Sequence, residues 1–260
     1  MNLAPAPAPA RASETATAVP TVPLLYINLD EDVERRRAFE SAFATTGLAI
    51  ERHTATRWTR LSPAEQAALH SPALNQMHYF RPLVAGECGC YASHIAVWRA
   101  LLSGSAPALV VLEDDVRPEP GFAEAVQAIA ALPSGWDMVK LIGRPRERPA
   151  RRQPLSRRFE LVTYRRVPSL TAGYAVSRSG AEKLLATRVP FYRPIDVDLR
   201  LWWESSLVMR GVLPAAIALA ETELQSSVGE RHGSAGWRQQ WRKFVFKLRY
   251  SFANAAAREP

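Results

Sequence analysis

Short apolar runs alternate with segments of helical spacing along most of the chain. The run at 24–29 is typical of a buried strand, and the segment after it places Val33, Phe39 and Phe43 at helical intervals. Strand character resumes at 49–56. Strand, helix and strand in this order predict the beginning of a parallel α/β sheet.

The same alternation continues through the middle of the chain. Helices are expected over 87–102, 119–131 and 178–188, and strands over 108–116, 136–143 and 169–177. Ser177 is suited to cap the last of these helices because its hydroxyl can accept from a free backbone N–H. A further helix is expected over 194–211. The pattern predicts an α/β fold with a Rossmann-like, mostly parallel sheet flanked by helices.

The two ends of the chain depart from this pattern. Residues 1–21 are rich in Ala, Pro and Thr and predict a disordered leader, with a cleaved targeting segment as the alternative. Residues 237–252 repeat aromatic and apolar residues every three or four positions, with basic residues between them. Such a helix can lie in a membrane interface or pack on the domain. The expected division is therefore 1–21, 22–233 and 234–260.

Charge and composition narrow the class of protein. Lys and Arg outnumber Asp and Glu by 33 to 25, which gives a net charge of +8 and favours anionic partners. No apolar run approaches the ~20 residues of a membrane-spanning helix. Two cysteines, Cys88 and Cys90, cannot form a disulfide framework, which is typical of a reducing compartment. Nine arginines and three prolines in 144–166 predict a basic loop.

Three acids follow the apolar run that starts at Ala108. Glu113, Asp114 and Asp115 stand where the predicted strand ends, and ligands bind at that edge of an open α/β sheet. Adjacent carboxylates repel each other, and hard oxygen ligands suit Mg²⁺ or Mn²⁺. A metal held there would bridge a diphosphate. The alternative is a solvated acidic turn before Pro118.

Two further segments contain candidate chemistry. Residues 86–101 bring Glu87, Ser93 and His94 to the start of a predicted helix, where a histidine such as His94, taken alone, is more often a buried core residue than a functional one. Asp196 and Asp198 begin the helix predicted at 194–211. Asp196 can cap that helix or act as a general base toward an acceptor hydroxyl. The chain has neither a Walker A sequence nor a G-x-G-x-x-G motif, which argues against P-loop and dinucleotide sites.

Five segments in this order resemble glycosyltransferase family 25, the lipopolysaccharide and lipooligosaccharide galactosyltransferases with the collagen galactosyltransferases. They are YINLDEDVERR (26–36), GECGCYASH (86–94), VLEDDV (111–116), TAGYAVSRSGAEKLL (171–185) and PIDVDL (194–199). The resemblance implies a GT-A-like nucleotide-diphosphosugar transferase fold. It also implies transfer of a hexose, commonly galactose, from a UDP-sugar with inversion at the anomeric carbon.

The resemblance also implies roles for individual residues. Those at the nucleotide would be Asn28, Leu29, Arg35, Glu113 and Asp114. Those that hold Mn²⁺ or Mg²⁺ would be Asp114, Asp115 and His232. The catalytic base would be Asp196, with Asp198 as the second candidate.

The implied partners are a UDP-hexose and a lipid-linked or core oligosaccharide acceptor of lipopolysaccharide. The basic, aromatic C-terminal helix suggests an anionic membrane surface as a further partner. The expected location is therefore the cytoplasm or the inner face of the cytoplasmic membrane. No nucleic-acid partner is expected. From the residues alone, three other functions stay open: a nucleic-acid-binding basic protein, a metal-dependent phosphohydrolase or nucleotidyltransferase, and an inactive family member that only binds.

Overall fold

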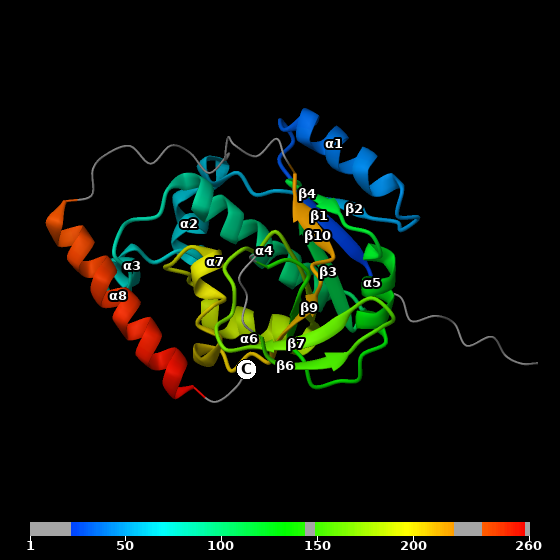
Figure 1. Cartoon of the computed structure of the whole chain (residues 1–260). Helices are drawn as coiled ribbons and strands as arrows, with labels where there is room; N and C mark the ends of the chain where they lie inside the picture. The colour runs from blue at the N-terminus through cyan, green and yellow to red at the C-terminus, as the bar shows by residue number, and fades with distance from the viewer. Residues whose placement is uncertain (1–21, 144–148, 221–235, 258–260) are drawn as a thin grey trace, which may run out of the picture.

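The sheet is built from the short apolar runs of the sequence, and helices cover both of its sides (Figure 1). A computed structural model describes residues 22–143, 149–220 and 236–257. The predicted leader 1–21 and the candidate ligand His232 lie outside the described residues.

The strands and helices are as follows. The strands are β1 (Leu24–Asn28), β2 (Glu51–Thr54), β3 (Ala108–Glu113), β4 (Val116–Pro118), β5 (Met138–Lys140), β6 (Pro149–Pro154), β7 (Glu160–Tyr164), β8 (Gly173–Ser177), β9 (Met209–Leu213) and β10 (Ile217–Leu219). The helices are α1 (Val33–Ala44), α2 (Pro63–Leu69), α3 (Pro72–His78), α4 (Ala85–Ser103), α5 (Phe122–Ala130), α6 (Arg178–Arg188), α7 (Ile195–Asp198) and α8 (Trp237–Ala256). Two 3₁₀ turns are η1 (Trp58–Arg60) and η2 (Trp202–Glu204).

The main sheet has eight strands in the order β2-β1-β3-β8-β5-β9-β7-β6. β1 is parallel to β2 and β3, and β5 is parallel to β9. β8 is antiparallel to both of its neighbours, and β7 is antiparallel to β6 and β9. The sheet is therefore mixed, and the prediction of a mostly parallel sheet is wrong. Parallel neighbours need a crossover, usually a helix, whereas the chain between β5 and β8 forms a strand pair instead.

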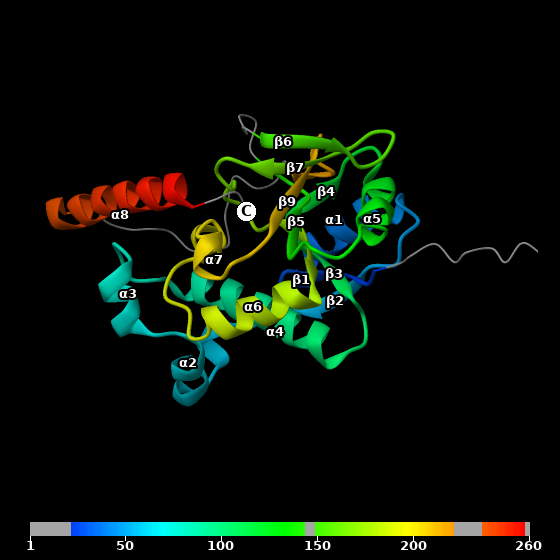
Figure 2. The ribbon, with the colours of Figure 1, turned by 90° about the horizontal axis from the view of Figure 1, so that it is seen from below.

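The alternating side chains of β3 divide the core into two halves. Val110 and Leu112 are buried with the apolar residues of α1 and α5. Leu109 and Val111 are buried with those of α4 and α6. Figure 2 shows α4 and α6 together on one side of the sheet. Because successive residues of a strand face opposite sides, an almost continuous apolar strand is what this three-layer arrangement requires.

The arginine-rich segment is not the predicted loop in its described part. β6 and β7 pair as antiparallel strands at one edge of the sheet. β7 is held by the buried side chains of Leu161, Val162 and Tyr164. The charged residues of the outermost strand, β6, are exposed, and its prolines stand at its two ends. Charges and terminal prolines are tolerated at an edge strand because its outer backbone groups need no partner strand.

The prediction of a single helix over 194–211 is also wrong. Only the one turn of α7 forms, followed by η2 and β9. The buried apolar residues Leu201, Trp202, Leu207 and Met209 do not keep the spacing of one helix face. The N-cap prediction at Ser177 is confirmed, since its side chain accepts from the backbone N–H of Gly180 at 3.1 Å.

Candidate active site

A pocket of about 480 Å³ lies where β1 and β3 end. Because these strands are parallel neighbours, their carboxyl ends open at the same edge of the sheet. The pocket is lined by six residues predicted to bind the nucleotide or the metal: Asn28, Leu29, Arg35, Glu113, Asp114 and Asp115. Ser93 and His94 of α4 line it as well. Asp196 and Asp198 are not among its lining residues.

Asp114 connects the ends of the two strands. The amide of Asn28, which is fully buried, donates to its carboxylate over 2.6 Å. Arg35 of α1 forms an ion pair with Asp114 at 2.8 Å and approaches Asp115 at 3.7 Å. Burial raises the pKa of Asp114, and the opposing effects of Asn28 and Arg35 do not cancel this rise. Arg35 therefore gives both adjacent carboxylates a positive neighbour at the edge where β1 and β3 end.

Glu113 faces the other way, toward α4. The Nε2 atom of His94 lies 3.4 Å from its carboxylate, and Nδ1 lies 2.8 Å from the hydroxyl of Tyr174. That hydroxyl accepts from the indole of Trp98, so its own proton is directed to Nδ1 and the proton of His94 is assigned to Nε2. Burial alone would raise the pKa of Glu113, but the neighbouring His94, Thr171 and Arg35 together outweigh burial, and the pKa is lowered.

The second family-like segment, 86–94, supplies the wall of the pocket on α4. Gly89 has no side chain, and a Cβ there would lie 2.8 Å from the carbonyl oxygen of Thr56. Ser93 accepts from the backbone N–H of Thr56 at 2.8 Å. Together these two residues hold the segment after β2 against α4. Glu87 does not enter the pocket, because it forms an ion pair with Arg81 at 2.5 Å near the start of the helix.

Sequence reasoning missed a further part of the pocket wall. Residues 55–59, which follow β2 and continue into η1, line the pocket. A usable signal was present: strand, helix and strand over 24–56 predict parallel strands, so the chain leaving the second strand reaches the same edge as Asn28. The parallel pairing of β1 and β2 confirms that arrangement.

Two sets of residues in the pocket could hold a metal ion. Asp114 and Asp115 offer the hard oxygen donors that suit Mn²⁺ or Mg²⁺. Arg35 forms ion pairs with both carboxylates, as expected where two adjacent negative charges require a nearby positive charge. Among the described residues, Cys90, His94 and Glu113 also bring one ligand atom each within 4.8 Å of one another. Burial raises the pKa of the Cys90 thiol well above its usual value. Nitrogen and sulfur donors would favour a softer ion there.

The two aspartates of α7 occupy different surroundings. Asp196 is partly exposed at the first turn of α7, which packs against α4. Burial raises the pKa of Asp196, and although a backbone hydrogen bond from Val197 opposes this, the charges of Glu87 and Glu113 add to the rise. Asp196 is therefore close enough to Glu113, an acid of the pocket, to feel its charge, and has the raised pKa that suits a base.

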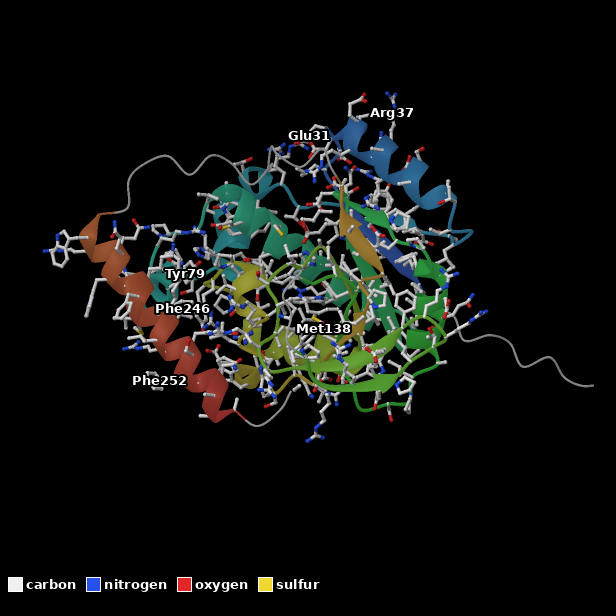
Figure 3. All side chains as sticks on the ribbon, in the orientation of Figure 1. Glu31, Arg37, Tyr79, Met138, Phe246 and Phe252 are labelled. Atoms are coloured by element: carbon white, nitrogen blue, oxygen red, sulfur yellow. The ribbon has the colours of Figure 1, made fainter. Side chains whose placement is uncertain are left out.

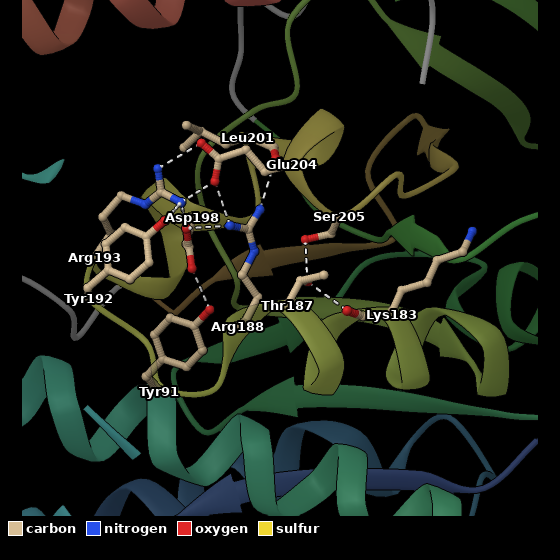
Figure 4. A network of polar contacts seen from close by, with 10 residues as sticks. All are labelled: Tyr91, Lys183, Thr187, Arg188, Tyr192, Arg193, Asp198, Leu201, Glu204 and Ser205. Carbon is tan, nitrogen blue, oxygen red and sulfur yellow. Dashed lines mark hydrogen bonds and ion pairs between the residues drawn. The ribbon is translucent and has the colours of Figure 1, made fainter. Parts of the chain in front are cut away.

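Asp198 is almost completely buried in a network of polar contacts (Figure 4). It accepts from the hydroxyl of Tyr91 at 2.6 Å and pairs with Arg193 at 2.6 Å and with Arg188 at 3.3 Å. Glu204 pairs with the same two arginines. These contacts join α4, α6, α7 and η2, which favours a structural role for Asp198 over the catalytic role predicted as second choice.

Replacing Asp198 by asparagine is expected to lower the free energy of unfolding by about 3 kcal/mol, because two buried arginines lose a compensating charge. Urea unfolding followed by circular dichroism measures this. The matched control is Asp30→Asn, which removes an exposed carboxylate paired with Arg52 at 2.5 Å and should leave stability nearly unchanged. Equal stability of the two variants would contradict the structural role.

Comparison with known proteins connects this geometry to a family. The family model described as "Glycosyltransferase family 25 (LPS biosynthesis protein)" matches residues 22–199. A "Glycosyltransferase 25 family member" of Aedes aegypti is 30% identical over 196 residues, 69% of this chain and 32% of that protein. "Procollagen galactosyltransferase 1" of Danio rerio is 29% identical over 182 residues, 66% of this chain and 29% of that protein. The matches thus span about a third of these relatives' length.

Two further comparisons qualify this result. A Rattus norvegicus relative, 30% identical over 49% of this chain and 22% of its own length, is named "Probable inactive glycosyltransferase 25 family member 3". A solved structure, "Crystal structure of a glycosyltransferase involved in the glycosylation of the major capsid of PBCV-1", has a TM-score of 0.33 and 13% identity, with 65% of each chain covered. A likeness at that level supports no conclusion about fold or function.

Proposed function

The chain belongs to glycosyltransferase family 25, and we propose that it transfers a hexose from a UDP-sugar to a saccharide hydroxyl, with inversion at the anomeric carbon. One observation carries the proposal. The family-like segments at 26–36, 86–94 and 111–116 meet in one pocket, at the edge where strands β1 and β3 both end. In an open α/β sheet, nucleotide ligands bind at that edge.

Different residues of the pocket are proposed to bind different parts of the UDP-sugar. Asn28 and Arg35 fix the carboxylate of Asp114, and the guanidinium of Arg35 is placed to share its charge with a diphosphate. His94 holds Glu113, which can then accept from a ribose hydroxyl. When bound at Asp114 and Asp115, Mn²⁺ or Mg²⁺ would supply further positive charge for the diphosphate. His232, which lies outside the described residues, is proposed from the sequence alone as a further metal ligand.

Asp196 is the proposed general base. It takes the proton of the acceptor hydroxyl as the oxygen forms a bond to the anomeric carbon. The bond from that carbon to the β-phosphate oxygen breaks in the same step, and UDP leaves with the electron pair. Attack opposite the leaving group inverts the anomeric centre. Burial and the nearby acids keep the pKa of Asp196 raised, which makes its carboxylate a stronger base.

The finer assignments belong to the same proposal. Galactose is the donor sugar favoured by the names of the procollagen galactosyltransferases. A core or lipid-linked oligosaccharide of lipopolysaccharide is the acceptor favoured by the description of the family. We propose a GT-A-like transferase domain over 22–233, with 234–260 as a separate C-terminal helix. The proposed location is the cytoplasm or the inner face of the cytoplasmic membrane.

The purified full chain is expected to release UDP slowly from UDP-galactose and faster when a core oligosaccharide acceptor is added. UDP-glucose is the comparison donor, and each mixture is measured with Mn²⁺ and with a chelator. Product analysis by nuclear magnetic resonance gives the configuration of the new linkage. Release of inorganic phosphate, with no effect of any saccharide, would replace the proposal with a phosphohydrolase. If no donor is turned over but UDP still binds, the chain would be an inactive family member, as the Rattus norvegicus relative is named to be.

A further inference from the structure

The C-terminal helix α8 is attached to the body of the protein along one face only. Phe246 packs against Tyr79 with ring centres 5.4 Å apart, and Tyr250 packs against Trp203 at 5.6 Å. Arg242 donates to the backbone carbonyl of Tyr79. These residues of α8 recur every four positions, so they form one stripe on the helix. Figure 3 shows Phe246 turned toward Tyr79 and the body.

The opposite face of α8 is apolar and exposed. Its large residues are exposed by 42% to 74% of their surface, and they recur every three or four positions. We call them the outer stripe: Trp237, Trp241, Phe244, Leu248 and Phe252. Among the described residues, only Met77 and Leu219 are further large apolar side chains exposed in this way. An apolar face of this size on a fixed helix needs a partner.

The charges of α8 indicate the chemistry of that partner. The helix has five basic residues and no acid: Arg238, Arg242, Lys243, Lys247 and Arg249. By helical geometry, Arg238 and Arg249 flank one side of the outer stripe and Lys247 flanks the other. All three are exposed. A stripe of tryptophan and phenylalanine with cations along both edges matches an anionic membrane interface, where aromatic rings enter and cations meet headgroups.

We propose that the outer stripe of α8 binds the surface of an anionic phospholipid bilayer, with the helix axis in the plane of the membrane. No helix in the described part of the chain is long and apolar enough to cross a bilayer. The stripe formed by Arg242, Phe246 and Tyr250 stays packed on the protein, so α8 connects the bilayer to the fold. This binding does not depend on the proposed transferase activity.

The position of α8 sets the orientation on the membrane. α8 lies beside α3, at the end of the molecule away from α1 and α5 in both views (Figures 1 and 2). Arg166 and Arg200 place their guanidinium groups 4.8 and 4.6 Å from the ring centre of Tyr250. These two guanidinium groups lie on the side of α8 that faces the body, so binding through the outer stripe would place α8 between the bilayer and this end of the protein.

Sedimentation of the full chain with vesicles tests the proposal. Wild type is expected to bind vesicles of phosphatidylcholine with 30% phosphatidylglycerol, and to bind pure phosphatidylcholine vesicles at least tenfold more weakly. The triple variant Trp237→Ser, Trp241→Ser, Phe244→Ser should bind the anionic vesicles about a hundredfold more weakly. The double variant Lys247→Gln, Arg249→Gln should lose about twentyfold at low salt and little at high salt.

Matched controls separate this surface from general effects. Leu219→Ser removes an apolar side chain of β10 that is exposed by 41%, and Arg37→Gln with Arg99→Gln removes two exposed charges far along the chain from α8. Both controls should keep wild-type vesicle binding. Circular dichroism should show unchanged helix content in every variant. Equal binding to neutral vesicles, or equal loss in the controls, would overturn the proposal. So would a dimer that the triple variant dissociates, without vesicle binding by wild type.

Discussion

Replacing Asp115 by asparagine is expected to lower kcat/KM for hexose transfer about a thousandfold. The substitution keeps the size of the side chain and removes one negative charge at the end of the strand pair. Asp114 and Asp115 share the cation Arg35 at 2.8 and 3.7 Å. Loss of one carboxylate would remove one of the two proposed ligands of the divalent ion and change how Arg35 is held. The steady-state rate of UDP release, measured over a range of Mn²⁺ concentrations, gives the effect.

Two measurements make this test specific to the pocket. Glu119→Gln removes a nearby carboxylate that pairs with Arg117 at 2.7 Å and does not line the pocket, so it should keep wild-type turnover. The midpoint of urea unfolding of Asp115→Asn should stay close to wild type, which separates activity from stability. Wild-type turnover with an unchanged Mn²⁺ dependence would contradict the assignment of this acid.

The location of the pocket could be predicted because it depends only on where the apolar strands end and on which edge of the sheet those ends share. Asn28 and Glu113 each end a short apolar run, and consecutive strands of an α/β unit place such ends at one edge. The matching of Asn28 to Asp114 then follows from the parallel register of β1 and β3. His94 is buried, as expected for a core histidine, and it also lines the pocket.

The roles of the two α7 aspartates could not be separated from sequence. Asp196 and Asp198 share a motif and a residue type. Their surroundings differ because Asp198 faces Arg188 and Arg193, which belong to a different helix end and loop. Only the folded chain brings these charges together. The prediction of a mostly parallel sheet failed for a related reason. β6 is an edge strand, which needs no apolar residue on its outer side, so its arginines gave the sequence no strand pattern.

Replacing Asp196 by asparagine is expected to lower kcat about a thousandfold while leaving the free energy of unfolding near wild type, because within the described part of the chain Asp196 forms no ion pair like those of Asp198. The sign of the pH dependence follows from the raised pKa. The base works only when its carboxylate is ionised, so wild-type kcat falls as pH decreases through that raised pKa. In Asp196→Asn this acidic limb should disappear, which the pH profile of kcat with saturating UDP-sugar and acceptor measures.

Asp198→Asn is the matched comparison, since it makes the same chemical change two residues away. It should lower stability yet keep the acidic limb of the pH profile at temperatures where it is folded. UDP affinity, measured by isothermal titration calorimetry, should stay close to wild type in Asp196→Asn, because a base that touches the acceptor hydroxyl does not hold the nucleotide. A limb that persists in Asp196→Asn and vanishes in Asp198→Asn would reverse the two roles, and the buried network would then surround the base itself.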